Sequence, residues 1–155
     1  MKKLVIVRHG DYCYSDGENV LSHAGEDQIR ELIEKLVAEN VIINSGGELV
    51  ILSSTARRAV DSAKIIAEAL GVRCNFNEIL WSESFRIENL PGALELVRQL
   101  ESADTVIMVT HYKYTKYFPQ YFGQEYLGVN SFPMSVAGKG RAWVIDCETK
   151  TCEYF

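Results

Sequence analysis

The sequence is poor in histidine, proline and cysteine: its 155 residues include three histidines, three prolines and four cysteines. It has no internal repeat and no low-complexity tract. Its apolar runs are much shorter than the about 20 residues that a helix needs to span a bilayer. The stretch before Arg8 lacks the apolar length and the cleavage site of a secretory signal peptide. These absences argue against a fibrous, disordered or membrane-spanning protein, and we expect a cytoplasmic one.

Positive charge is also in deficit, because 16 lysines and arginines face 21 aspartates and glutamates, for a net charge of −5. Such a balance disfavours nucleic acids and anionic membranes as partners, although it still allows a local basic pocket. The content of hydrophobic residues, 47%, and of charged residues, 24%, is that of a globular protein. The length predicts a single domain over residues 1–155.

The cysteines form no C-x-x-C pair, so the sequence predicts free thiols and no structural zinc site. They are Cys13, Cys74, Cys147 and Cys152. A cysteine-dependent phosphatase needs an arginine six positions after its nucleophile. The positions six residues after Cys13, Cys74 and Cys147 hold Asn19, Leu80 and Glu153. We therefore expect neither that chemistry nor a metal or other cofactor.

Short apolar runs alternate with segments of helical periodicity. The runs predict buried strands at residues 4–7, 49–52, 106–109 and 142–145. The periodic segments predict helices over residues 22–40, 59–70, 91–100 and 112–122. Residues 72–79 fit a strand or an extended connection. This alternation indicates an α/β protein with a three-layer α/β/α arrangement and a mainly parallel central sheet.

Polar residues follow three of the predicted strands. They are Arg8, His9 and Asp11 after the first strand, Ser53, Ser54, Arg57 and Arg58 after the second, and Thr110 and His111 after the third. If these strands are parallel, their carboxyl ends meet at one edge of the sheet, where ligands bind in such folds. Two histidines and up to three arginines at one edge suit the binding of a dianion, most simply a phosphoryl group.

Four motifs carry a family resemblance. They are Arg8-His9-Gly10, Leu21-Ser22-His23-Ala24-Gly25 with Gln28, the segment from Ser53-Ser54 through Arg58-Ala59 to Ser62-Ala63, and Val109-Thr110-His111. In content and order they resemble the motifs of the histidine phosphatase superfamily, which has the phosphoglycerate-mutase-like fold. The length is similar to that of its short members, the phosphohistidine phosphatases.

The resemblance implies a metal-independent phosphatase that acts through a phosphohistidine on His9, with a phosphorylated small molecule or a phosphoprotein as substrate. Arg8, Arg58 and a protonated His111 would bind the phosphoryl oxygens. The two arginines should keep His9 neutral, and a hydrogen bond from its other ring nitrogen would fix the tautomer. Adjacent helical residues point about 100° apart, so Arg57 is expected at the rim.

The proton donor for the leaving group is less defined. Glu83 is our prediction for this general acid, with Glu78 as the alternative, and phosphohistidine phosphatases do without one. Ser15 stands where larger family members have asparagine, and it either donates to phosphate or belongs to a turn at Asp16-Gly17. Asp11 is interpreted as a turn or helix cap.

Two other functions compete with this one. A phosphate-binding regulatory module would keep the pocket but turn over little or no substrate. A metal-dependent hydrolase would use the three histidines, and the sequence offers no cluster of carboxylate and histidine ligands for it.

Overall fold

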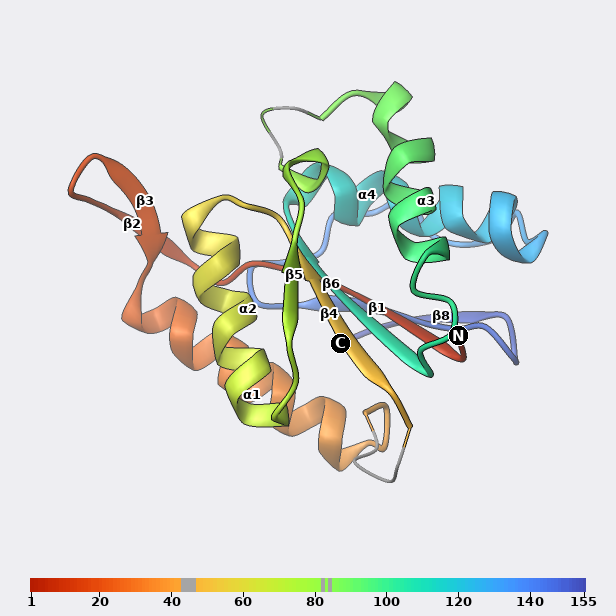
Figure 1. Ribbon diagram of the computed structural model, residues 1–155, viewed down its shortest axis with the longest axis horizontal. Helices are drawn as coiled ribbons and strands as arrows, with labels where there is room; N and C mark the ends of the chain where they lie inside the picture. The colour runs from red at the N-terminus through yellow and green to blue at the C-terminus, as the bar shows by residue number, and fades with distance from the viewer. Residues whose placement is uncertain (43–46, 82, 84) are drawn as a thin grey trace.

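A six-stranded sheet with the strand order β5-β4-β6-β1-β7-β8 forms the centre of the molecule (Figure 1). The computed structural model describes residues 1–42, 47–81, 83 and 85–155. The strands of the sheet are β1 (Lys3–Arg8), β4 (Leu49–Ser53), β5 (Cys74–Phe76), β6 (Thr105–Thr110), β7 (Ala142–Asp146) and β8 (Thr151–Tyr154). The helices are α1 (His23–Ala38), α2 (Arg57–Leu70), α3 (Leu90–Arg98) and α4 (Tyr112–Phe122). No helix in the described ranges has the length and apolar content to cross a bilayer.

Four strands of the sheet, β5, β4, β6 and β1, are parallel, as the sequence predicts. β7 runs antiparallel to β1, and β8 antiparallel to β7. Arg8 pairs in register with Thr110, and Ser53 with Val109. The carboxyl ends of β1, β4 and β6 therefore meet at one edge, and this edge carries the polar motifs.

The apolar runs are continuous because both faces of the sheet are covered. Leu4 and Ile6 pack into the layer with α3 and α4, whereas Val5 and Val7 pack into the layer with α1 and α2. All four side chains are fully buried. Each such burial stabilises the fold by about 1.5–3 kcal/mol relative to exposure. The three layers of the predicted α/β/α arrangement are thus present (Figure 1).

Helix ends follow local signals. Ser22 caps α1, because its Oγ accepts a hydrogen bond from the Gly25 N–H at 3.1 Å. Gly71 ends α2 in the left-handed region, with φ of 67°, which glycine adopts without a steric cost. Pro91 lies in the first turn of α3.

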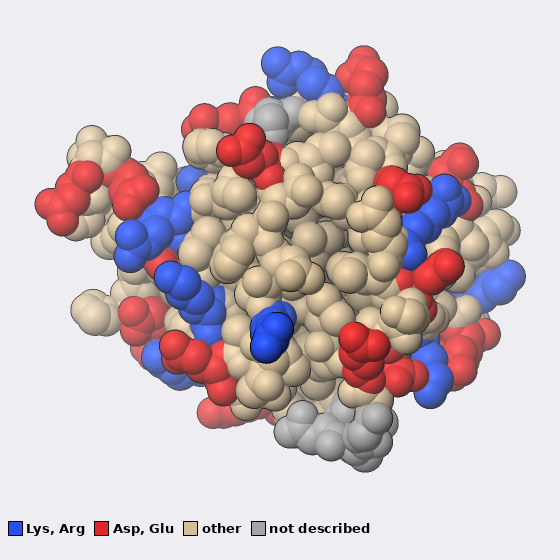
Figure 2. All heavy atoms as spheres, in the orientation of Figure 1, with Lys and Arg blue, Asp and Glu red and all other residues tan. Residues whose placement is uncertain are grey.

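On the face of the molecule shown in Figure 2, acidic and basic side chains are interspersed around a broad area of uncharged ones.

A two-stranded hairpin, β2 (Tyr12–Ser15) and β3 (Glu18–Leu21), projects from the body of the molecule (Figure 1). Its turn residues Asp16 and Gly17 have φ of 50° and 85°, which match the tight turns that favour Asp-Gly. The sequence predicts the turn but not the strands. Their side chains are mostly exposed, so no apolar alternation marks them.

Candidate active site

His9 lies directly after β1 and is buried. Its Nδ1 is 2.8 Å from the carbonyl oxygen of Gly10. Because a carbonyl only accepts hydrogen bonds, Nδ1 carries the hydrogen and Nε2 keeps its lone pair. Arg58 Nε donates to that Nε2 at 3.2 Å. The tautomer of His9 is thus fixed with its basic nitrogen toward Arg58.

His111 follows β6, is fully buried, and lies with its ring centroid 5.0 Å from that of His9. Arg58 Nη2 is 3.3 Å from His111 Nδ1, and a guanidinium cannot accept, so Nδ1 is the acceptor. His111 Nε2 therefore carries the hydrogen and donates to Ser54 Oγ at 2.9 Å. One arginine bridges the two rings, and the two histidines hold opposite tautomers.

Burial is the main reason why both imidazoles are neutral at physiological pH. It lowers the pKa of His9 to about 4, with further lowering by the positive charges of Arg58, Arg8 and Lys139, against the opposing hydrogen bond to Gly10. The pKa of His111 is lowered to about 2, again mainly by burial. The expectation of a neutral His9 agrees with this. The expectation of a protonated His111 does not hold in this structure, because desolvation and its cationic neighbours disfavour a second positive charge.

Arg8, the last residue of β1, reaches across to the C-terminal part of the chain. Its Nη1 donates to the Ala137 carbonyl at 3.0 Å, and its guanidinium carbon is 5.8 Å from the ring centre of Tyr112. Its Nε is buried and has no hydrogen-bond partner among the described residues. A buried, unsatisfied donor costs free energy, so this atom favours an acceptor such as a phosphoryl oxygen.

Arg57 and Arg58 separate as the helical geometry predicts. Arg57 is exposed, and it pairs with Asp61 Oδ1 at 2.7 Å and Glu18 Oε1 at 3.4 Å. Arg58 is partly buried between the two histidines. Ser62, one turn further along α2, accepts a hydrogen bond from the Gly10 N–H at 3.1 Å. This motif of α2 thus supplies one cation to the site and one anchor for the segment after His9.

The glycines of two motifs allow α1 to pack closely against the segment that carries His9. A Cβ on Gly10 would lie 2.5 Å from the Gly25 carbonyl oxygen, and one on Gly25 would lie 2.1 Å from the Asp11 carbonyl oxygen. Gln28 Oε1 accepts a hydrogen bond from the Asp11 N–H at 2.8 Å. The motif that begins at Leu21 therefore positions the loop after His9.

The sequence prediction gives no role at the site to Tyr12 or Lys139, and it does not include the contact of Ser54 with His111. The ring centre of Tyr12 is 5.4 Å from that of His9, 5.2 Å from the Arg58 guanidinium carbon and 4.7 Å from Lys139 Nζ. Ser54, which the sequence places at the shared edge of the sheet, holds His111 through its Oγ. Ser54 lies in one of the four motifs, whereas Tyr12 and Lys139 lie outside all of them.

Glu83 is exposed and lies in the connection between η1 (Glu78–Leu80) and η3 (Ile87–Asn89). This connection is tied to the site, since Thr110 Oγ1 donates to the Leu80 carbonyl at 2.8 Å. The Tyr114 hydroxyl donates to the Ile79 carbonyl in the same connection. Within the described residues, no hydrogen bond or ion pair joins Glu83 to His9, so its role stays a prediction. The same is true of Glu78, which is also exposed.

Ser15 lies at the exposed end of β2, where it pairs with Glu18 across the Asp16-Gly17 turn. It lines a hollow of about 490 Å³ that also involves Arg57 and Asp61 rather than the two histidines. Its described contacts fit the turn interpretation, and substrate binding by Ser15 stays an untested prediction. Asp11 pairs with Lys139 at 2.8 Å instead of capping a helix with its side chain.

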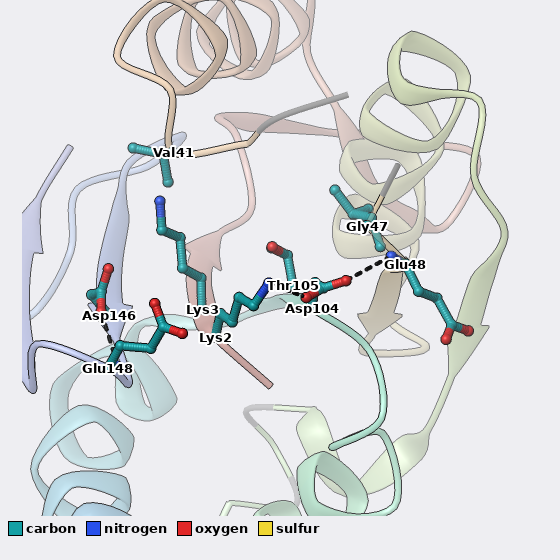
Figure 3. A pocket seen from close by; sticks show the side chains of 10 residues that line it. Lys2, Lys3, Val41, Gly47, Glu48, Asp104, Thr105, Asp146 and Glu148 are labelled. Atoms are coloured by element: carbon teal, nitrogen blue, oxygen red, sulfur yellow. Dashed lines mark hydrogen bonds and ion pairs between the residues drawn. The ribbon is translucent and has the colours of Figure 1, made fainter. Parts of the chain in front are cut away.

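A separate cavity of about 300 Å³ opens where β1, β4 and β6 begin, at the opposite edge of the sheet (Figure 3). Lys2 Nζ pairs there with Asp104 Oδ1 at 2.9 Å, and Asp104 Oδ2 accepts from the Glu48 N–H at 3.2 Å. The cavity is thus remote from the histidines. Over the described part of the chain, no three histidine, cysteine, aspartate or glutamate side chains are grouped so as to hold a metal ion.

Sequence searches found no matching family model and no matching curated protein. Solved structures do match. The protein from Agrobacterium tumefaciens assigned as the phosphohistidine phosphatase SixA has a TM-score of 0.70 and 18% identity, over 99% of this chain and 97% of that one. The protein histidine phosphatase SixA complexed with tungstate has a TM-score of 0.67 and 18% identity, over 99% and 94%. A mycobacterial glucosyl-3-phosphoglycerate phosphatase has a TM-score of 0.66 and 17% identity, over 100% and 97%. These full-length matches show that this chain has the phosphoglycerate-mutase-like α/β fold of those structures.

Proposed function

We propose that this protein is a metal-independent phosphatase that hydrolyses a phosphomonoester or a phosphoprotein through a phosphohistidine on His9. One observation carries the proposal. His9 Nδ1 is committed to the Gly10 carbonyl, so the lone pair of Nε2 lies beside Arg58 and next to His111. A neutral imidazole with a fixed tautomer is the nucleophile that phosphoryl transfer requires.

In the first step, the Nε2 lone pair attacks phosphorus, an N–P bond forms, and the P–O bond to the leaving group breaks. Arg58 exchanges its bonds to the imidazoles for phosphoryl oxygens, and Arg8 offers its unpartnered Nε–H. The incoming dianion favours protonation of His111, which can then donate from Nδ1. The leaving oxygen takes a proton, which we assign to Glu83.

In the second step, water attacks the phosphohistidine. The new P–O bond replaces the N–P bond, whose electrons return to His9 Nε2, and the carboxylate of Glu83 takes the proton of the water. Inorganic phosphate leaves and the enzyme is restored.

Bound oxyanions in similar structures support a phosphorylated substrate. The SixA structure holds tungstate, and a structure of the mycobacterial glucosyl-3-phosphoglycerate phosphatase is a complex with VO3. Tungstate is a tetrahedral dianion like phosphate, and VO3 has the three oxygens of a phosphoryl group in transfer. By analogy, the pocket between the two histidines of this chain would accept a phosphoryl group.

A phosphate-binding module with little or no turnover is the second candidate. The observation in its favour is the hydrogen bond from Arg58 to His9 Nε2, which occupies the nucleophilic lone pair. The test measures release of phosphate from an aryl phosphate in excess EDTA, together with trapping of an acid-labile, base-stable phosphoprotein. Turnover in EDTA that His9→Ala abolishes, in a folded variant, supports the phosphatase. Tungstate binding without turnover supports the module, and activity lost in EDTA supports a metal-dependent hydrolase.

A further inference from the structure

Lys139 brings a third positive charge to the surroundings of His9. Its ammonium group is 2.8 Å from Asp11 Oδ1 and 4.7 Å from the ring centre of Tyr12. The ring of Tyr12 in turn contacts the imidazole of His9 and the guanidinium group of Arg58. Lys139 is therefore separated from the nucleophile and its arginine by a single aromatic ring.

The backbone fixes Lys139 in this position. The N–H of Gly140 donates to the carbonyl oxygens of both Arg8 and His9, at 3.1 Å each. Gly140 has φ of +67°, and a Cβ there would lie 2.5 Å from Gln28 Cβ, so glycine is needed. The residue that follows Lys139 is thus hydrogen-bonded to the backbone of Arg8 and His9.

The side chain of Lys139, by contrast, is free to leave Asp11. Both partners of the pair are more than one-third exposed, with side-chain exposures of 36% and 38%. Solvent-exposed pairs of this kind are weak, and a lysine stem has several rotatable bonds. A dianion at His9 presents a stronger attraction than one half-exposed carboxylate.

We propose that Lys139 binds the phosphoryl group of the substrate, and that Asp11 is its counter-ion while the site is free. The inference rests on the proposed function in assuming that the pocket takes a phosphoryl group. It adds a cation from the C-terminal part of the chain to the two histidines and two arginines. The aromatic ring of Tyr12 guides the ammonium group between its two partners, since rings attract cations.

The test uses two substitutions that should change the affinity for phosphate in opposite directions. Affinity for inorganic phosphate is measured by titration calorimetry at neutral pH. Lys139→Met should weaken binding by about fivefold, and Lys139→Arg should restore most of it. Asp11→Asn should strengthen binding, because it frees Lys139, and this gain should vanish in the Asp11→Asn, Lys139→Met double variant. Lys64→Met, which removes an exposed charge from α2, is the control for net charge and should leave affinity unchanged.

The outcomes separate the inference from the proposed function. Arg58→Ala should abolish phosphate binding and so report the site itself. Binding that depends on Arg58 but not on Lys139 overturns the inference and leaves the phosphatase proposal intact. Equal weakening by Lys139→Met and Asp11→Asn also overturns it, since that pattern means a structural ion pair. Dependence on Lys139 in a protein without turnover supports the inference alone, and wild-type protein that binds no phosphate overturns both.

Discussion

Arg58 Nε donates to His9 Nε2 at 3.2 Å, so the arginine that we propose to bind phosphate holds the nitrogen that we propose as the nucleophile. Nitrogen NMR of the imidazoles should find His9 protonated at Nδ1 and His111 at Nε2 at pH 7. The positive charge of Arg58 is one cause of the lowered pKa of His9, so Arg58→Ala should raise that pKa from about 4. Matching tautomers in the two rings would contradict the geometry of the site.

Stability should fall in mild acid because of the two buried histidines. The pKa of His9 is lowered from 6.5 to about 4, and that of His111 to about 2. Above pH 6.5 both imidazole rings are neutral in the native and in the unfolded protein. Below pH 6.5 the two histidines bind protons in the unfolded chain but not in the native one. Each histidine then removes about 1.4 kcal/mol of stability per pH unit down to pH 4.

Urea unfolding between pH 7 and 4 measures this slope. His9→Asn and His111→Asn should each flatten it relative to wild type. His23→Asn is the matched control, because His23 is exposed at the start of α1. An unchanged slope in all three variants would show that other groups control the acid sensitivity.

Close packing of α1 against the His9 loop predicts a clear contrast between two glycines. Gly25 and Gly92 are each the third residue of a helix, α1 and α3. A Cβ on Gly25 meets the Asp11 backbone at 2.1 Å, whereas one on Gly92 meets the flexible end of Ile79 at 2.4 Å. Gly25→Ala should cost about 1–3 kcal/mol of stability, as overpacking does.

Gly92→Ala is the control for this substitution. It gains helix propensity of about 1 kcal/mol against a small rearrangement of Ile79, and should be close to neutral. Chemical denaturation gives both values, and phosphatase assays should show a loss confined to Gly25→Ala. Equal effects of the two substitutions would mean that Gly25 has no special contact.

Glu83 as general acid predicts a dependence on the leaving group. Glu83→Gln should slow hydrolysis of alkyl phosphates by about 10²–10⁴-fold, the usual range for this form of catalysis. Activated aryl phosphates, which depart without a proton, should be little affected. Steady-state rates on both substrates, with Glu78→Gln in parallel, measure the difference. An equal loss of rate on alkyl and aryl phosphates would indicate that Glu83 acts in binding or folding. No loss of rate on either substrate would mean that Glu78 is the general acid or that the enzyme uses none.

Residue patterns carry the part of the fold that depends on burial. The run from Leu4 to Val7 predicts β1 because both faces of the sheet are covered, and the polar residues after β1, β4 and β6 predict the shared edge. The hairpin and β8 are exposed, and exposed strands have no apolar pattern to detect. Each is held by pairing with a neighbouring strand across a short turn, β2 with β3 and β8 with β7, and not by burial of an apolar face.

The same distinction applies to the site. Arg8, His9, Arg58 and His111 lie in recognisable motifs, and the geometry brings them together. The bond from His111 to Ser54, and the approach of Tyr12 and Lys139 to His9, join separate segments. No local pattern encodes these pairings, nor the burial that makes His111 neutral.

Arg8 has its partners at the far end of the chain. Its backbone N–H donates to the Arg141 carbonyl, and its guanidinium to the Ala137 carbonyl. During synthesis, every residue of the four motifs is made before Ala137. A nascent chain halted before that point holds both histidines and both arginines, yet Arg8 has no acceptor to orient it. Phosphate binding should therefore appear late in synthesis, after the residues to which we assign the chemistry have been made.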